Sequence, residues 1–292
     1  MRKILDNITL RKGSLKDKSE ISELCKNIWH GRDYLPVVWN DWINNGNSYF
    51  IIADLENEIV AVYHAYSFNS EIWLESLRVK EQYRHQGIAN YMVKDLITTV
   101  QSKQIDNIRL VTSIENTKSI SLFKNLNFKE SHYCQYMYID CNDIEELSTL
   151  SDVKILNDYD EISSIFKHMN TTKKYIPIWW RWWSVNSYSI KEYLKNGIAI
   201  ISSNSGHTDS LLLLRKTNDY GREDRSQLFI VKGQYEEIKN LLSYVKTSFP
   251  EFISSKLFCF PETNSDESSI LSNLGFKKRT SLVLMNKSIV SI

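Results

Sequence analysis

The segment from residue 74 to residue 96 constrains the fold of this chain more than any other part of it. Its sequence, LESLRVKEQYRHQGIANYMVKDL, joins an apolar strand pattern, a polar loop with one glycine and a helical pattern. Gly87 and the small Ala89 let the backbone approach a phosphate, and the free amide groups at the start of the helix point toward an anion. The segment therefore predicts an anion site built mainly from backbone, in which Arg84 and His85 either add donors or are solvated loop residues.

The elements predicted around this segment define a mixed α/β fold. Hydrophobic periodicity in the first half predicts the order β, α, α, β, β, β, α, β, α, β. The second half repeats this order with different side chains. We therefore expect tandem domains at residues 1–147 and 148–292, with their boundary near the polar segment CNDIEELSTLSD.

One local match favours a duplication. The pattern Tyr-x-Pro-x-x-Trp-x-x-Trp occurs at residues 34–42 and again, with the same spacing, at residues 175–183. In one interpretation the proline begins a helix and the two tryptophans face the core. In the other, the first copy lines an acceptor pocket, where Tyr34, Trp39 and Trp42 pack a substrate side chain or attract an ammonium group. The two interpretations are compatible.

Composition bounds the partners of the chain. With 36 basic and 35 acidic residues the formal charge is +1, so we expect no global field that would hold nucleic acid or an anionic membrane. No apolar run approaches the roughly 20 residues of a membrane span, and the N-terminus lacks the apolar stretch of a signal peptide. The four scattered cysteines and the histidines show no metal-ligand spacing. These features predict a cytoplasmic monomer or homodimer without a metal.

Two motifs resemble those of the GNAT superfamily of N-acetyltransferases. The acetyl-coenzyme A (acetyl-CoA) loop of that family reads Gln/Arg-x-x-Gly-x-Gly/Ala after a strand ending in Leu-x-Val. This chain has, in that spacing, Leu77, Val79, Arg84, Gly87 and Ala89. A second family motif, Asn-x-x-(Ala/Ser)-x-x-Leu-(Tyr/Phe)-x-x-x-(Gly/Asn)-Phe, is matched at residues 116–128. The resemblance covers most of the first half and implies an acetyl-CoA-dependent acyltransferase.

The resemblance also implies a role for each matched residue. The backbone of Leu77 and Val79 would pair with the pantetheine arm, which Asn116 would also contact, while Ser119 and Phe123 would lie beside the arm and its thiol end. The backbone amides that would hold the pyrophosphate belong to His85, Gln86, Gly87, Ile88, Ala89 and Asn90. A backbone amide near Leu77 would polarise the acetyl carbonyl, and transfer would be direct within a ternary complex.

Glu75 is the predicted general base, because an amine nucleophile must lose a proton. Strand alternation puts Glu75 on the same face as Leu77 and Val79, beside the acyl site. The alternative is that this carboxylate forms a buried salt bridge, with Arg78 or with Arg32.

Phe123 is a departure from the family pattern. Many members carry a tyrosine there, whose hydroxyl can protonate the leaving thiolate, and phenylalanine has no such proton. Water or the hydroxyl of Tyr133, Tyr136 or Tyr138 would take the role, or the thiolate would leave without a dedicated acid.

The second half departs further. Its equivalent segment, LFIVKGQYEEIKNLL, has Gly233 but no second small residue, and it places two glutamates where a phosphate would lie. We expect a degenerate GNAT-like domain without a cofactor, which covers, stabilises or completes the acceptor site of the first domain.

Residues 31–42, followed by the strand at 75–79, resemble the branch of the family that contains histidine N-acetyltransferase, in which the acceptor is a free amino acid. The sequence thus predicts an N-acetyltransferase for a small amine, in particular a free amino acid. Two other classes stay open. One is an enzyme that acetylates protein N-termini or lysines, and the other is an acyl-CoA-binding regulatory module that has lost chemistry.

Overall fold

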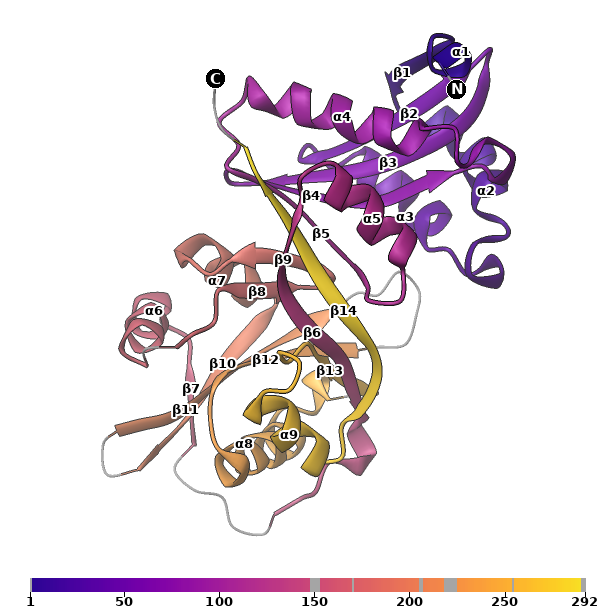
Figure 1. Ribbon diagram of the computed structural model, residues 1–292. Helices are drawn as coiled ribbons and strands as arrows, with labels where there is room; N and C mark the ends of the chain where they lie inside the picture. Colours follow the sequence, from indigo (N-terminus) through magenta and orange to yellow (C-terminus); the bar gives the residue numbers. More distant parts are fainter. Residues whose placement is uncertain are drawn as a thin grey trace. The chain divides into compact units, whose positions relative to one another are not determined.

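The computed structural model describes residues 2–147, 153–169, 171–204, 207–217, 225–253 and 255–289. The chain divides into two compact units (Figure 1): unit 1 contains Met1–Ser131 and Leu284–Ile292, and unit 2 contains His132–Val283. This division differs from the predicted boundary after residue 147, because each half gives part of its last strand to the other unit. Residues 148–152 of the predicted linker lie outside the described residues.

Unit 1 has the element order expected from the sequence, with one short helix before it. Its strands are β1 (Ile8–Lys12), β2 (Ser48–Leu55), β3 (Glu58–Phe68), β4 (Glu71–Val79) and β5 (Asn107–Ser113). Its helices are α1 (Arg2–Leu5), α2 (Lys18–Cys25), α3 (Leu35–Ile43), α4 (Ile88–Gln101) and α5 (Thr117–Asn125). The strands lie in the order β1-β2-β3-β4-β5; the first four are antiparallel to their neighbours and β5 is parallel to β4.

Helices α4 and α5 share a core with one face of this sheet. Met92 and Leu96 of α4, Phe123 of α5 and the strand residues Ile72 and Leu74 belong to one buried cluster. The apolar positions of α4 recur at the spacing of a helical face, which is why this helix packs along one side only. Helix α2 contacts β3 and β4, and α3 contacts β2.

The end of β14 (Lys277–Ser288) completes unit 1. Met285 and Ile289 belong to the same buried cluster as α4 and α5. The amide of Ile289 donates to the carbonyl of Asp106 at 2.8 Å, and Nε of Arg109 donates to Oδ1 of Asn286 at 3.0 Å. The core of unit 1 therefore includes residues from the last part of the chain.

Unit 2 repeats the architecture with one insertion. Its strands are β6 (Lys129–Asp140, mostly in this unit), β7 (Val153–Leu156), β8 (Tyr175–Ile178), β9 (Arg181–Ser184), β10 (Gly197–Asn204), β11 (His207–Thr217), β12 (Arg225–Lys232), β13 (Lys256–Cys259) and the first part of β14. Its helices are α6 (Tyr159–His168), α7 (Ser187–Leu194), α8 (Tyr235–Ser248) and α9 (Asp266–Asn273). The sheet order β6-β13-β12-β11-β10-β7 matches that of unit 1, with β12 and β13 parallel as β4 and β5 are.

The insertion is the second copy of the aromatic pattern. In the first copy Pro36 lies in the first turn of α3, whereas in the second Pro177 lies in β8, which pairs with β9 as a two-stranded ribbon. Trp179, at the turn of the ribbon, has a positive φ of 61°, which a helix does not allow. The interpretation that both copies begin a helix is therefore wrong, and the match at residues 34–42 and 175–183 does not align equivalent elements.

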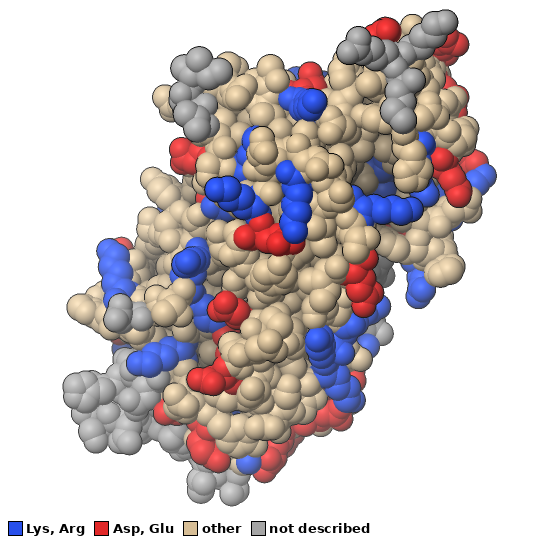
Figure 2. Space-filling model, in the orientation of Figure 1, with Lys and Arg blue, Asp and Glu red and all other residues tan. Residues whose placement is uncertain are grey.

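Three features of the composition can be compared with the structure. The four cysteines are buried free thiols. On the face shown in Figure 2 basic and acidic side chains are intermixed, so that face presents no extended field of one sign. Over the described ranges, no helix has both the length and the apolar character needed to cross a bilayer.

Candidate active site

Ser76 interrupts the regular pairing of β3 with β4. His64 lies opposite Glu75 and Val62 lies opposite Arg78, so three steps along β4 match two steps along β3. Ser76 has a φ of 57°, in the left-handed region that β-strands avoid. This is a β-bulge, which bends a strand and re-aims the side chains after it.

The bulge corrects the predicted orientation of Glu75. Leu77 and Val79 pack against the cluster that contains α4 and α5, as Ile72 and Leu74 do before the bulge. Glu75 instead shares a face with Arg78, since their partners His64 and Val62 are two residues apart on β3. The prediction that Glu75 lies on the same face as Leu77 and Val79 is therefore wrong, because the extra residue inverts the alternation.

Strands β4 and β5 diverge where the bulge begins. Their parallel register covers Glu71–Trp73 on β4 and Asn107–Arg109 on β5, although both strands continue beyond it and both are fully described. The edge of β4 from Ser76 to Val79 therefore borders a gap in the sheet. Leu77 and Val79, whose backbone the resemblance assigns to the pantetheine arm, lie on this edge, and both are half-buried.

The loop after β4 leads to an open helix N-terminus. Gly87 precedes α4 with a φ of 86°, and the first amide with a partner inside the helix is that of Tyr91, which donates to the Gly87 carbonyl at 2.9 Å. The amides of Ile88, Ala89 and Asn90 thus precede the helical bonds, and the first turn has no acidic residue to occupy them. This end of α4 has the geometry of an anion site.

Two loop side chains fold back onto the loop itself. Nε of the exposed Arg84 donates to the carbonyl of Val79 at 3.1 Å, and the amide of Gln86 donates to the carbonyl of Gln82 at 3.0 Å. His85 is exposed and has a positive φ of 63°. The sequence left Arg84 either as a donor to the anion or as a solvated loop residue. In the structure its Nε bond to the Val79 carbonyl closes the loop.

Helix α5 carries the second motif. Asn116 caps it, with Oδ1 accepting from the amide of Ser119 at 3.2 Å. Asn116 is exposed and Ser119 is half-buried, whereas Phe123 is buried and packs edge-on against Phe128 with ring centroids 5.1 Å apart. Phe123 is therefore part of the core beneath the gap.

Glu75 belongs to a hydrogen-bonded chain of three side chains. Its Oε1 lies 2.8 Å from Nδ1 of His64, and Nε2 of His64 lies 3.0 Å from Oγ of Ser48. The His64 side chain is 0% exposed and that of Glu75 is 13% exposed. Of the two salt-bridge partners considered for Glu75, Arg78 pairs instead with Asp33, Nε to Oδ2 at 2.8 Å.

Aromatic rings line the approach to this chain. Tyr34 lies between Trp29 and Trp42, with ring centroids 6.1 Å and 5.9 Å away, and its hydroxyl lies 2.8 Å from Oγ of Ser76 at the bulge. Burial, and then the charge of Glu75, raise the pKa of Tyr34 to about 12. Trp29 is 56% exposed, has a φ of 49° and lies beneath the guanidinium of Arg78 at 4.8 Å.

The two aromatic residues predicted to bind substrate have different surroundings. Tyr34 is half-buried at the bulge, as described above. Trp39 is 0% exposed, its Nε1 donates to the carbonyl of Ser14 at 3.1 Å, and its ring packs against Phe50 with centroids 4.3 Å apart. Trp39 therefore belongs to the core, and the structure does not support a direct substrate contact, because no part of the ring is accessible.

Unit 2 has different side chains at the equivalent positions. The parallel pairing begins at Glu71 in unit 1 and at Arg225 in unit 2, so these two residues are equivalent. Four residues further along each strand, Glu75 pairs with His64 and Phe229 pairs with Leu213. At the start of α8 the carboxylate of Glu237 accepts from the amide of Gln234 at 2.6 Å. Unit 2 thus places an apolar pair where unit 1 has His64 and Glu75, and an acidic cap where α4 is open.

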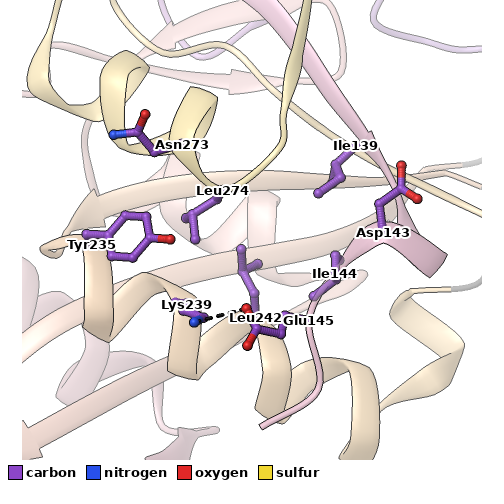
Figure 3. Close-up of a pocket in the computed structure, with 9 residues that line it drawn as sticks. All are labelled: Ile139, Asp143, Ile144, Glu145, Tyr235, Lys239, Leu242, Asn273 and Leu274. Carbon is purple, nitrogen blue, oxygen red and sulfur yellow. Dashed lines mark ion pairs between the residues drawn. The ribbon is translucent and has the colours of Figure 1, made fainter.

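The inserted ribbon is bound two residues before this apolar position, at Gln227 of β12. Both ends of the fully buried amide of Gln227 bind the ribbon turn, because Oε1 accepts from the amide of Trp179 at 2.8 Å and Nε2 donates to its carbonyl at 3.1 Å. A separate hollow of unit 2 (Figure 3) is lined by Tyr235 and Asn273 among others, and two further lining residues, Lys239 and Glu145, form an ion pair 2.9 Å long. In the parts of the chain that the structure describes, no three His, Cys, Asp or Glu side chains gather as metal ligands would.

Three comparisons with known proteins agree with this geometry. Residues 17–128 match the model of the acetyltransferase (GNAT) family. Histidine N-acetyltransferase of Scomber australasicus is 31% identical over 90 residues, which are 30% of this chain and 27% of that protein. The chain thus spans little more than a quarter of the length of this curated relative.

The solved structures match over nearly the whole chain. A GCN5-related N-acetyltransferase from Sphaerobacter thermophilus has a TM-score of 0.66 at 12% identity, covering 97% of this chain and 96% of that one. A tandem GNAT protein from the clavulanic acid biosynthesis pathway has a TM-score of 0.62 at 9% identity, covering 97% and 99%. The fold is therefore the tandem GNAT fold, a mixed α/β architecture, as the sequence predicts.

Residues 17–128 are thus similar to the GNAT acetyltransferase family, whose enzymes use acetyl-CoA as acyl donor, and these residues lie within unit 1.

Sequence reasoning missed His64, Ser48 and Ser76. A signal for His64 was present, because a regular register from the two-residue turn at Asn69 and Ser70 already places it opposite Glu75. The bulge at Ser76 left no comparable signal, since the strand has no glycine there.

Proposed function

We propose that unit 1 transfers the acetyl group of acetyl-CoA to the amine of a small molecule, in particular a free amino acid. The observation that carries the proposal is Glu75. It is a largely buried carboxylate, bound to a fully buried histidine, at the point where β4 turns away from β5. A carboxylate costs free energy when buried, so its presence at the gap calls for a function.

The residues around the gap fit the cofactor. The edge of β4 at Leu77 and Val79 would pair with the pantetheine arm, and the amides from His85 to Asn90 would hold the pyrophosphate at the N-terminus of α4. Asn116, Ser119 and Phe123 would border the arm from α5. When bound, acetyl-CoA supplies the activated acetyl thioester.

Glu75 would accept the proton that the acceptor amine loses as its nitrogen attacks the acetyl carbon. A backbone amide at the bulge would stabilise the oxyanion as the bond from carbon to sulfur breaks. Tyr34 remains a neutral phenol at assay pH, because its pKa is raised to about 12, so it would orient Ser76 and not act as the base.

The acceptor side supports a small amine. The rings of Trp29, Tyr34 and Trp42 form a wall that leads from the surface to His64 and Glu75, and aromatic faces attract ammonium groups. The name of the relative from Scomber australasicus supports an amino acid as acceptor. We further propose a cytoplasmic monomer or homodimer in which unit 2 has a supporting role, consistent with its capped α8 and its apolar Leu213 and Phe229.

The first test measures thiol release from acetyl-CoA against free amino acids, polyamines and short peptides, with Glu75→Gln and the exposed Glu23→Gln as matched variants. We expect turnover with an amino acid, a loss of about 10²- to 10⁴-fold in kcat for Glu75→Gln, and no loss for Glu23→Gln.

The other outcomes are distinct. Preference for peptides would point to a protein acetyltransferase. Binding of acetyl-CoA without turnover on any acceptor would point to a regulatory module. Full activity of Glu75→Gln would remove Glu75 from the mechanism.

A further inference from the structure

His64 is held at both ring nitrogens and packs against two aromatic rings. Besides its bonds to Glu75 and Ser48, its ring stacks on Trp42 with centroids 4.3 Å apart and lies 4.6 Å from Phe50. With no exposed surface, the ring cannot turn over without displacing these neighbours. The direction of each of its ring nitrogens is therefore fixed.

The partners determine which nitrogen carries the proton. An ionised Glu75 only accepts hydrogen bonds, so Nδ1 of His64 must be the donor to it. The hydroxyl of Ser48 can donate, and it satisfies Nε2 of a neutral ring. The chain then runs in one direction, from Ser48 to His64 to Glu75.

The second unit shows that the fold does not require a polar pair at this register. The equivalent positions hold Leu213 and Phe229, which pair in the same way between β11 and β12. A buried histidine and carboxylate cost more to bury than two apolar side chains. Their presence in unit 1 alone therefore points to a role other than packing.

We propose that His64 is a positioning residue for Glu75, its Nδ1–H fixing the carboxylate toward the acceptor amine and favouring its ionised form. This inference rests on the proposed function. The proton of the amine passes to Glu75, and no bond from hydrogen to His64 breaks. The histidine thus acts through the carboxylate and does not relay the proton itself.

Several other groups set the charge around Glu75. Tyr34 approaches from the start of α3, and on β4 Arg78 shares the face of Glu75 and is paired with Asp33. These groups are the same in any variant of His64, so a change in the pH profile of such a variant reports the lost Nδ1–H. A hydrogen bond to the charged form lowers the pKa of a carboxyl, so its loss raises that pKa.

Two variants separate the two ends of the histidine. His64→Asn keeps a donor near the position of Nδ1 but cannot reach Ser48, and His64→Gln keeps a donor near Nε2 but not toward Glu75. Both lose the same stacking, so each serves as the stability control of the other. The readouts are kcat, the acceptor KM, the pH profile of kcat/KM, the affinity for coenzyme A and the midpoint of thermal unfolding.

We expect His64→Gln to lose about 10- to 100-fold in kcat, part of what a general base supplies, with the acidic limb of kcat/KM moved to higher pH. His64→Asn should stay within about 5-fold of the parent, a cost below about 1 kcal/mol, with an unmoved limb. Both should bind coenzyme A like the parent.

The inference is overturned if both variants lose kcat equally, in proportion to the fall in their unfolding midpoints, and keep the pH profile of the parent. His64 would then have a structural role only. The parallel Glu75→Gln measurement keeps the two proposals apart. If Glu75→Gln is inactive while His64→Gln is fully active, only the positioning role fails; if Glu75→Gln is active, the proposed base fails.

Discussion

Ser76 has an effect larger than its size, because its left-handed backbone decides which side chains of β4 share a face. Before it, Glu75 points away from α4 and α5; after it, Leu77 and Val79 point toward them. The hydroxyl of Tyr34 binds Ser76 at 2.8 Å, so one side chain from the start of α3 holds the bulge. The orientation of the proposed base thus depends on a hydrogen bond that does not involve it.

Tyr34→Phe tests this dependence. Removal of the hydroxyl should lower the free energy of unfolding by about 1 kcal/mol, the usual contribution of a hydrogen bond. It should also lower kcat/KM for the acceptor, because the bulge positions both Glu75 and the edge of β4. Steady-state kinetics and denaturant unfolding check the two effects, with the exposed Tyr188→Phe as control. Unchanged kinetics in Tyr34→Phe would show that Ser76 holds its conformation unaided.

At this scale short sequence patterns select candidate residues but do not give their directions. The loop around Gly87 and the candidates Glu75 and Asn116 were all selected in this way. The face of Glu75 was not predicted correctly, because alternation assumes a regular strand and Ser76 breaks it with one residue. The sequence also placed Trp39 in the acceptor pocket, whereas it lies in the core. A tryptophan at helical spacing gives the same sequence pattern in either place.

Helices α4 and α8 occupy equivalent places in the two units and differ at their first turn. Helix α4 follows Gly87 with open amides, whereas in α8 the side chain of Glu237 caps the backbone of Gln234. Negative charge at a helix N-terminus stabilises the helix but also occupies the amides that an anion would need. The same element therefore begins with open amides in one unit and with its own acidic cap in the other.

Gly87→Ala tests the open terminus. An alanine at a φ of 86° costs about 1–2 kcal/mol, and we expect weaker binding of coenzyme A because the loop must shift. Gly275→Ala in unit 2 is the matched control, since its φ is 93°. The added Cβ would meet one methyl group in each variant, Cδ1 of Leu5 at 3.6 Å for Gly87 and Cδ1 of Ile139 at 3.5 Å for Gly275. Calorimetric titration should show loss of affinity in Gly87→Ala only. Equal affinity in both variants would place the pyrophosphate elsewhere.

The element order was predictable because periodicity reports burial along each strand and helix. The repeated aromatic pattern was misleading, because its residues are compatible with two kinds of element. Proline is compatible both with the first turn of a helix, as at Pro36, and with a strand that has only one neighbour, as at Pro177. Local sequence could not choose between them, since the ribbon depends on the bond from Gln227, on a distant strand, to its turn.

The whole molecule is joined by an exchange of strands. Unit 1 closes its core with Met285 and Ile289, and unit 2 includes β6 from His132 onward. The residues of unit 1 are not continuous in the sequence, so this division differs from one after residue 147, which follows the repeat. Sequence periodicity marks where an element is, and not which core it joins.

A chain that stops at Val283 tests this exchange, because it keeps unit 2 and removes the last part of unit 1. Loss of a buried Met or Ile side chain costs about 2–5 kcal/mol, and two such losses rival the whole stability of a typical domain. Hydrogen exchange should show α4 and α5 losing protection while α8 keeps it. Met285→Ala should give a weaker form of the same pattern. Full protection of α4 in the shortened chain would contradict the exchange.

The shared strand also orders events during synthesis. Residues 1–131 leave the ribosome long before Met285 and Ile289 are translated, so the core of unit 1 stays incomplete while all of unit 2 is being made. Until those two residues are made, the nascent N-terminal half exposes apolar side chains that Met285 and Ile289 bury in the finished core.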